Sequence, residues 1–448
     1  MGSPRLAAVL AALLTVAWLW IVPYRLTDGD SCLYAAMGHE VAVEGNWAAP
    51  TWAHGGERAD FHENPPLVVW LPAALERAGL DARQAPVIAN ALWLWLLAAA
   101  MWRLAGGWRG AGALALGALM LHYPVAKYVV RASLELPFAA CAVAAVACLR
   151  SARPAAFLWG GLFFAGAVLS RGVFALLVPA VWLVDARVGV RRPLRRPAAA
   201  LILGLSLAVL FDLFHRRATG HGFWAAFWAE QLGPSLAGTA EHANREPTWS
   251  YYGGRLLLYG QPWLLIAVVG GLRRWKRLRP DYLVGLAWVL IVFAGAVIAQ
   301  RQASRYLFAA WPGLALMVGA AGLGWWHRLP ERAQRRIAVV VLFLIPAMTA
   351  AKTLFTPRDE WWTAAVQLRE RAALGWGDGP PPVVYGPFSA HDDRAKQFLR
   401  HHLGVWAFTT PAGGAPPGSL EFRWTDHGFP GVDDLVAPHF ALRWRGEG

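Results

Sequence analysis

The distribution of apolar residues along the chain predicts a bundle of membrane-spanning helices. Apolar runs recur throughout the first 355 residues, and three of the clearest are 7–21, 201–210 and 339–351. With their neighbours, these runs reach the roughly 20 residues that a helix needs to cross a hydrocarbon core. A membrane β-barrel would instead show segments of about ten residues with alternating hydrophobicity. We therefore expect an all-α polytopic membrane protein.

Eleven segments fit this helical pattern, and a shorter one, 66–80, is expected to dip into the membrane, so that about 11 to 13 transmembrane helices occupy residues 1–355. A polar loop is expected at 215–253. The proline- and glycine-rich stretch 356–448 is predicted to form a small outer α/β domain, with a helix at 361–373 and a strand at 382–385. The eleven expected spans are 5–24, 84–104, 110–126, 134–149, 155–170, 172–185, 197–214, 254–272, 282–299, 305–325 and 337–355.

Charge gives this arrangement an orientation. If the N-terminus lies in the cytoplasm, every second loop faces that side, and those loops carry 19 basic residues. The first outer loop, 25–83, carries nine acidic residues against four basic ones. This alternation follows the positive-inside rule and places the C-terminal domain on the outer face. The first span is expected to be retained, because no small-residue cleavage pattern follows it.

Composition agrees with a membrane protein and excludes other classes. Hydrophobic residues make up 57% of the chain and charged residues 16%, against about 25% charged in soluble proteins. The net charge of +14 would also suit a nucleic-acid partner, but the arginines cluster in short gaps between apolar spans, where they set topology. The three cysteines lack metal-ligand spacing, and two lie in one apolar span, so no disulfide framework is expected.

Candidate catalytic groups gather at the outer ends of the predicted spans. Topology brings the acidic first loop to the same face as several arginines from distant parts of the sequence. Arginine forks bind phosphate in a bidentate manner, and a carboxylate can act as a general base toward a hydroxyl. We therefore expect a phosphorylated lipid as substrate. The residues concerned are Asp28, Asp30, His62, Glu63, Arg131, Glu135, Arg171, His215, Arg216, Arg217, Arg301 and Arg305.

Five short motifs resemble those of the GT-C membrane glycosyltransferases, in particular the bacterial aminoarabinose transferases and protein mannosyltransferase-like proteins. Each motif alone is weak, but they occur in the family's order and at the predicted outer face. The resemblance covers about residues 15–320. The motifs are Asp30 with Tyr34, Gly45–Pro50, Glu63–Trp70, Arg131–Pro137 with Leu169–Ala175, and Arg305-Tyr306 followed by Pro312.

The resemblance implies a reaction and a set of roles. Asp30 would be the catalytic base, supported on the acceptor side by Asp28, Tyr34, His62, Glu63 and Glu135. The phosphate of a polyprenyl-phosphate sugar would be held by Arg131, Arg171, Arg301, Arg305 and Tyr306. The reaction would be an inverting sugar transfer to a glycolipid, an envelope glycan or a protein at the outer side of a bacterial inner membrane. The resemblance fixes no cofactor, and a divalent metal contacted by His62 and Glu63 stays open.

Three positions depart from the family pattern. Asn64 stands where many relatives have lysine, so one phosphate contact is missing or is supplied by Arg58 or Arg131. Glu135 replaces an aspartate and extends that carboxylate by one methylene. Arg171 replaces a lysine, which keeps the charge but changes a point donor into a fork.

Other readings stay open at the sequence level. Asp28 could cap a helix or form a turn, Pro65-Pro66 could simply start a helix, and Arg301 and Arg305 could anchor the membrane interface. A transporter or flippase of a lipid-linked substrate is the main alternative function, although it would commonly show two related halves. A non-catalytic protein of the same fold that assists envelope assembly is the third possibility.

Overall fold

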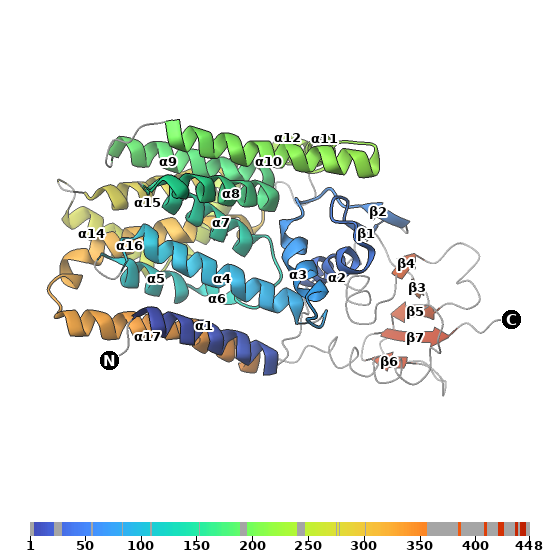
Figure 1. Cartoon of the computed structure of the whole chain (residues 1–448), viewed down its shortest axis with the longest axis horizontal. Helices are drawn as coiled ribbons and strands as arrows, with labels where there is room; N and C mark the ends of the chain where they lie inside the picture. Colours follow the sequence, from blue (N-terminus) through green and yellow to red (C-terminus); the bar gives the residue numbers. More distant parts are fainter. Residues whose placement is uncertain are drawn as a thin grey trace.

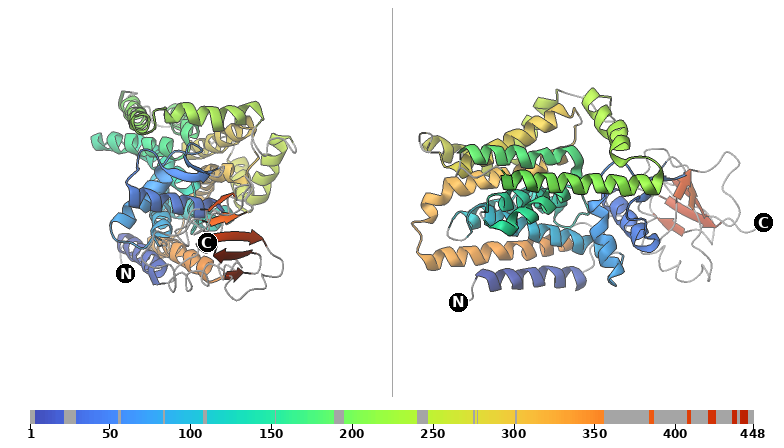
Figure 2. Two further views of the ribbon diagram at one scale, coloured as in Figure 1. Left: turned by 90° about the vertical axis from the view of Figure 1, so that its right-hand side faces the viewer. Right: turned by 45° about the horizontal axis from the view of Figure 1, so that its top comes forward.

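The computed structural model shows a helical bundle with a small β-sheet at one end (Figures 1 and 2). The residues that the structure describes are 4–21, 29–54, 57–82, 84–107, 110–151, 153–188, 195–239, 247–274, 276, 278–300, 302–355, 384–386, 407–409, 420–424, 435–437 and 440–444.

Helices follow one another through the first 355 residues, because apolar runs of this length satisfy their backbone polar groups internally only as helices. Their bounds are α1 (Pro4–Ile21), α2 (Gly29–Glu44), α3 (Leu67–Arg77), α4 (Ala85–Leu104), α5 (Gly112–Met120), α6 (Tyr123–Tyr128), α7 (Glu135–Leu149), α8 (Pro154–Arg171), η1 (Gly172–Leu176), α9 (Leu177–Val188), α10 (Arg195–Thr219), α11 (Phe223–Phe227), η2 (Trp228–Leu232), α12 (Gly233–Ala237), α13 (Thr248–Tyr259), α14 (Trp263–Arg273), α15 (Pro280–Ile298), η4 (Ser304–Ala310), α16 (Trp311–Trp326) and α17 (Glu331–Phe355).

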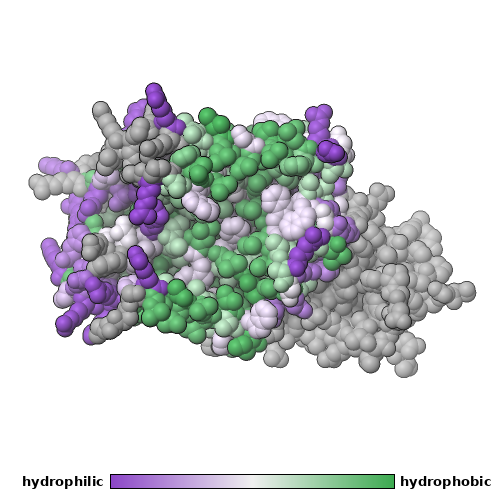
Figure 3. Space-filling model, in the orientation of Figure 1, coloured by the Kyte–Doolittle hydropathy of each residue, from purple (hydrophilic) through white to green (hydrophobic). Residues whose placement is uncertain are grey.

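The centre of the bundle is built around α7, which is buried along nearly its whole length. It packs against α4 and α8, while α10 covers α8 and α15 lies against α16. The outer helices expose large apolar side chains, such as Leu13 on α1 and Leu205 on α10, as expected where lipid surrounds the protein. Figure 3 shows the resulting hydrophobic band, with hydrophilic residues gathered at the end away from the sheet.

Within the described residues, seven helical stretches are long and apolar enough to cross a membrane, or eight if α13 and α14 form one span. Eleven spans were predicted, and the difference comes from shorter helices and from two predicted spans that form one continuous helical stretch. The predicted span 110–126 is divided between α5 and α6. The predicted continuous span 254–272 is wrong, because α13 and α14 meet at 90° next to Pro262, whose missing N–H cannot continue a helix.

The two predicted spans between 155 and 185 form one continuous helical stretch, 155–188, that reverses direction at Gly172. The contacts of this stretch establish the reversal. Arg171 at the end of α8 pairs with Glu135 at the start of α7, whereas Arg150 after α7 pairs with Asp185 near the end of α9. The two ends of α7 are far apart, so α8 and α9 run antiparallel across the bundle.

The first outer loop contains regular secondary structure. It contains α2, a hairpin of β1 (Thr51–His54) and β2 (Glu57–Asp60), and α3. The predicted polar loop at 215–253 is also partly helical, because α10 continues to Thr219 and α11, η2, α12 and the start of α13 follow.

The described strands of the C-terminal stretch form one sheet in the order β4-β3-β5-β7-β6. Strand β3 is parallel to β4 and β5, and the other pairs are antiparallel. The predicted strand at 382–385 overlaps β3, whereas the predicted helix at 361–373 lies outside the described residues. The strands are β3 (Val384–Gly386), β4 (Ala407–Thr409), β5 (Leu420–Trp424), β6 (Leu435–Ala437) and β7 (Phe440–Trp444).

Candidate active site

Asp30 and Arg305 form an ion pair although 275 positions separate them in the sequence. Asp30 lies in the first turn of α2, where the helix dipole favours a negative charge. Arg305 lies on η4, the short 3₁₀ turn that leads into α16. The Asp30 side chain is 51% exposed, so its carboxylate has an open side that a second molecule can reach.

A second ion pair, between Glu135 and Arg171, lies deeper. The two side chains are only 4% and 8% exposed, and Arg171 donates to the Glu135 carboxylate. Burial of either charge alone would be costly, so each residue depends on the other. The Arg171 guanidinium also lies 5.0 Å from the centre of the Tyr306 ring, a cation–π contact that fixes its plane.

The two pairs belong to one polar site. The charges of Asp30 and Glu135 both act on Arg305, and so do the hydroxyls of Tyr34 and Tyr306. Four segments bring these groups together: the start of α2, the start of α7, the connection from α8 to η1, and the turn η4. Glu135 therefore acts on both arginines, and Arg305 links the two ion pairs.

A cavity of about 420 Å³ opens beside this site. One end of the cavity is lined by Glu135, Arg171, Arg305 and Tyr306, and the rest of its wall is apolar. That wall comes from α7, η1, α9, η2, α12, α15 and η4, and its residues are Phe138, Val173, Phe174, Leu176, Leu177, Ala180, Trp228, Leu232, Leu236, Ile291, Val292, Gly295, Ile298, Ala299, Phe308 and Ala309. An apolar chamber with two cations at one end matches a molecule that has an anionic head and a hydrocarbon chain.

Tyr34 and Asn64 connect Asp30 to the segment before α3. The Asn64 amide donates a hydrogen bond of 3.3 Å to the Tyr34 hydroxyl, one turn of α2 beyond Asp30. Burial raises the pKa of Tyr34 well above its usual value, and the nearby Asp30 carboxylate raises it further. Tyr34 therefore stays a neutral phenol. The Glu63 carboxylate also acts electrostatically on Tyr34. Asn64, which stands where the family pattern has lysine, forms a hydrogen bond with Tyr34.

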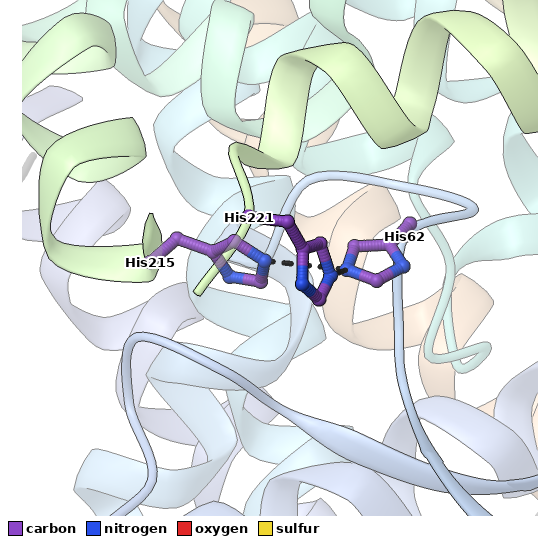
Figure 4. A group of neighbouring side chains, drawn as sticks. All are labelled: His62, His215 and His221. Carbon is purple, nitrogen blue, oxygen red and sulfur yellow. Dashed lines mark hydrogen bonds between the residues drawn. The ribbon is translucent and has the colours of Figure 1, made fainter. Parts of the chain in front are cut away.

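His62 lies in a different cluster from Glu63. Its ring meets those of His215 and His221, which flank the end of α10 (Figure 4). Burial, together with the neighbouring His215 and His221, lowers the pKa of His62 to about 4. The sequence predicted His62 as a candidate metal contact but did not connect it with His215 or His221, and the short spacing of these two across Gly220 was the available signal.

The remaining predicted residues lie apart from the cavity or outside the described chain. Arg131 lies over the Tyr128 ring, 5.9 Å from its centre, and does not line the cavity. Tyr128 was missed by the sequence analysis, yet Glu135, Arg305, Arg131 and Arg171 all act on its hydroxyl. Asp28 and Arg301 lie outside the described residues, so their assigned roles stay predictions.

No family model matches the chain. It is 24% identical over 393 residues to undecaprenyl phosphate-alpha-4-amino-4-deoxy-L-arabinose arabinosyl transferase 2 of Proteus mirabilis, covering 81% of this chain and 70% of that protein. It is 27% identical over 340 residues to the arabinosyl transferase 1 of Sodalis glossinidius, covering 72% of this chain and 59% of that protein. The chain thus spans between about three fifths and seven tenths of these relatives.

Two solved structures have a similar fold. ArnT from Cupriavidus metallidurans bound to undecaprenyl phosphate superposes with a TM-score of 0.69 at 14% identity, over 98% of this chain and 97% of that one. The oligosaccharyltransferase of Archaeoglobus fulgidus gives a TM-score of 0.60 at 11% identity, over 94% of this chain and 70% of that one. The chain therefore has the architecture of these polytopic membrane proteins.

Proposed function

We propose that this chain, a membrane glycosyltransferase of the GT-C type, moves a sugar from a polyprenyl-phosphate donor to an acceptor at the outer face of a bacterial plasma membrane. The acceptor is a glycolipid, an envelope glycan or a protein. The first outer loop and the C-terminal sheet face the periplasm, and the basic loops face the cytoplasm.

The observation that carries this proposal is the cavity with an apolar wall and a polar end formed by Arg171, Arg305 and Tyr306. A polyprenyl chain fits the apolar wall, and its phosphate then meets both guanidinium groups. The Cupriavidus structure with a similar fold holds undecaprenyl phosphate, and the relatives are named for donors built on that lipid. Undecaprenyl phosphate linked to 4-amino-4-deoxyarabinose is therefore the first donor to test.

The geometry supports a proposed role for each ion pair. Arg171 uses one nitrogen on Glu135 and retains further N–H donors for the phosphate. Asp30, on the open side of Arg305, accepts the proton of an acceptor hydroxyl or amine. The freed nucleophile attacks C1 of the sugar, the bond between C1 and the phosphate oxygen breaks, and the configuration inverts. Arg171 and Arg305 stabilise the charge that grows on the departing lipid phosphate.

The decisive experiment compares Asp30→Asn with the unaltered protein in lipid vesicles that contain the donor and candidate acceptors. Loss of the base should lower the transfer rate by about 10²- to 10⁴-fold. Mass spectrometry of the lipids measures the product. Glu44→Gln is the control, because Glu44 lies at the opposite end of the same helix.

Full transfer activity in Asp30→Asn would remove Asp30 from the role of base. Movement of the donor between leaflets without sugar transfer by the unaltered protein would instead indicate a transporter. Both variants should elute as the unaltered protein does in size-exclusion chromatography, so that a folding defect is distinguished from a catalytic one.

A further inference from the structure

Three histidines from two distant parts of the chain point their ring nitrogens at one another (Figure 4). The Nε2 atom of His62 lies 3.2 Å from Nε2 of His215 and 3.0 Å from Nε2 of His221. His62 precedes α3, His215 lies in the last turns of α10, and His221 follows that helix. One ring nitrogen from each lies within 4.8 Å of the other two.

Hydrogen bonding among the three rings does not explain this convergence. The Nδ1 atom of His215 lies 2.8 Å from the Ala48 carbonyl oxygen, and Nδ1 of His221 lies 3.2 Å from the Thr219 carbonyl oxygen. A carbonyl oxygen only accepts, so each Nδ1 carries the proton and each Nε2 presents a lone pair. His62 Nε2 has at most one proton to offer, and two lone pairs face it.

A metal ion satisfies all three nitrogens at once. Zinc binds imidazole nitrogen at about 2.0–2.1 Å in a tetrahedron, which places neighbouring ligand atoms roughly 3.3 Å apart. The two Nε2 separations of 3.2 and 3.0 Å are close to that edge length. The two Nδ1–H groups bonded to backbone carbonyls are also the outer-shell partners that metal-bound histidines commonly have.

The surroundings suit a held ion. His62 and His215 are buried, and the Phe223 ring centre lies 6.1 Å from that of His62 and 5.4 Å from that of His215. The Glu230 carboxylate lies 3.7 Å from His62 Nδ1 and brings a negative charge near the cluster. Two buried ligands fix the position, and the exposed His221 completes the set from the solvent side.

We propose that His62, His215 and His221 bind a divalent transition-metal ion, with zinc as the best fit, and that this ion fastens the first outer loop to the end of α10. Imidazole ligands suit zinc, copper, iron and nickel, whereas magnesium and calcium take oxygen ligands, which three imidazole rings do not supply. A water molecule fills the fourth coordination position.

The proposed ion is a positioning element for the site described above. His62 lies two residues before Asn64, whose amide holds Tyr34 one turn from Asp30. Fixing His62 to α10 therefore fixes the wall that carries Asp30. The metal site itself rests on the histidine geometry and stands whether or not the proposed sugar transfer is correct.

Metal analysis of the purified full-length protein tests the site. The protein is stripped with EDTA, incubated with Zn²⁺, desalted and analysed by inductively coupled plasma mass spectrometry. We expect about one zinc ion per unaltered chain and background metal in His215→Gln/His221→Gln, because a lone His62 cannot hold the ion. His327→Ala is the control, since His327 is exposed and lies between α16 and α17.

Equal zinc content in the unaltered protein and the double variant would overturn the proposal. If the double variant does not fold, the unaltered protein alone decides. Its melting temperature should fall after EDTA and recover with Zn²⁺ but not with Mg²⁺. If neither EDTA nor Zn²⁺ changes the melting temperature, the proposed role of the ion in fastening the loop is contradicted.

Discussion

At the scale of single residues, Arg171 is the clearest example of a side chain whose position decides its chemistry. Its charge is kept in a buried place by the Glu135 carboxylate and by the face of Tyr306. The family pattern predicted a cation here, and the longer Glu135 in place of aspartate is the residue that reaches it. Arg131 was predicted for the same phosphate; its guanidinium lies over the Tyr128 ring, and its phosphate role stays a prediction.

Exchanging Arg171 or Arg131 for lysine tests which of the two contacts the donor phosphate. Arg171→Lys keeps the charge and loses the planar fork, so we expect kcat/KM for the polyprenyl-phosphate donor to fall about 10- to 100-fold. Arg131→Lys is the matched change outside the cavity and should cost less than about threefold. Steady-state kinetics over a range of donor concentrations measures both. Equal losses would place Arg131 on the phosphate as well.

At the scale of elements, the turn from α8 to α9 positions the cationic end of the cavity. Gly172 follows Arg171 and has a φ of 54°, a conformation that side chains other than glycine's rarely adopt. A Cβ atom at this position would lie 3.0 Å from the Phe227 ring. The reversal of the chain and the close approach of Phe227 at the end of α11 therefore both need glycine, and together they place Arg171 at the cavity.

Gly172→Ala should destabilise the protein by about 1–2 kcal/mol, because it forces a Cβ into the left-handed region and against Phe227. Gly254→Ala is the matched control, since Gly254 lies in helix α13 with no atom near its missing Cβ. The control should be neutral or slightly stabilising. Thermal unfolding in detergent measures both variants, and an unchanged melting temperature for Gly172→Ala would contradict the strain.

At the scale of the whole molecule, the distribution of charge gives the bundle its direction. The hydrophilic end in Figure 3 lies opposite the sheet, and Arg150 there joins α7 to α9 and α15 through Asp185 and Asp281. The acidic first loop lies at the other end with α2 and α3 (Figure 1). By the positive-inside rule, this distribution predicts that the hydrophilic end lies in the cytoplasm and that the proposed site faces outward.

Cysteine labelling of intact cells tests this orientation. In a background with Cys32, Cys141 and Cys148 replaced, a cysteine introduced at Glu44 should react with a membrane-impermeant maleimide. A cysteine introduced at His327 should react only after the membrane is permeabilised. The reverse pattern would place the first loop in the cytoplasm and exclude a periplasmic acceptor.

The sequence by itself determined the helical membrane architecture and most of the candidate residues. The length of an apolar segment and the charge of a loop can be read from neighbouring residues. In lipid, the backbone N–H and C=O groups of such a segment must form hydrogen bonds with one another, and a helix allows this. Short motifs also placed Asp30, Arg171 and Arg305 at the same face. The bend between α13 and α14 was not predicted, because a long apolar run alone does not show where a chain turns.

Only the tertiary structure decided which side chains meet. Helix α7 is buried along nearly its whole length, so its apolar pattern has no preferred face and does not identify its neighbours. The pairing of Asp30 with Arg305, and the meeting of His62 with His215 and His221, join segments that lie more than 150 residues apart. Such contacts depend on how whole helices pack, and no spacing within the chain encodes them.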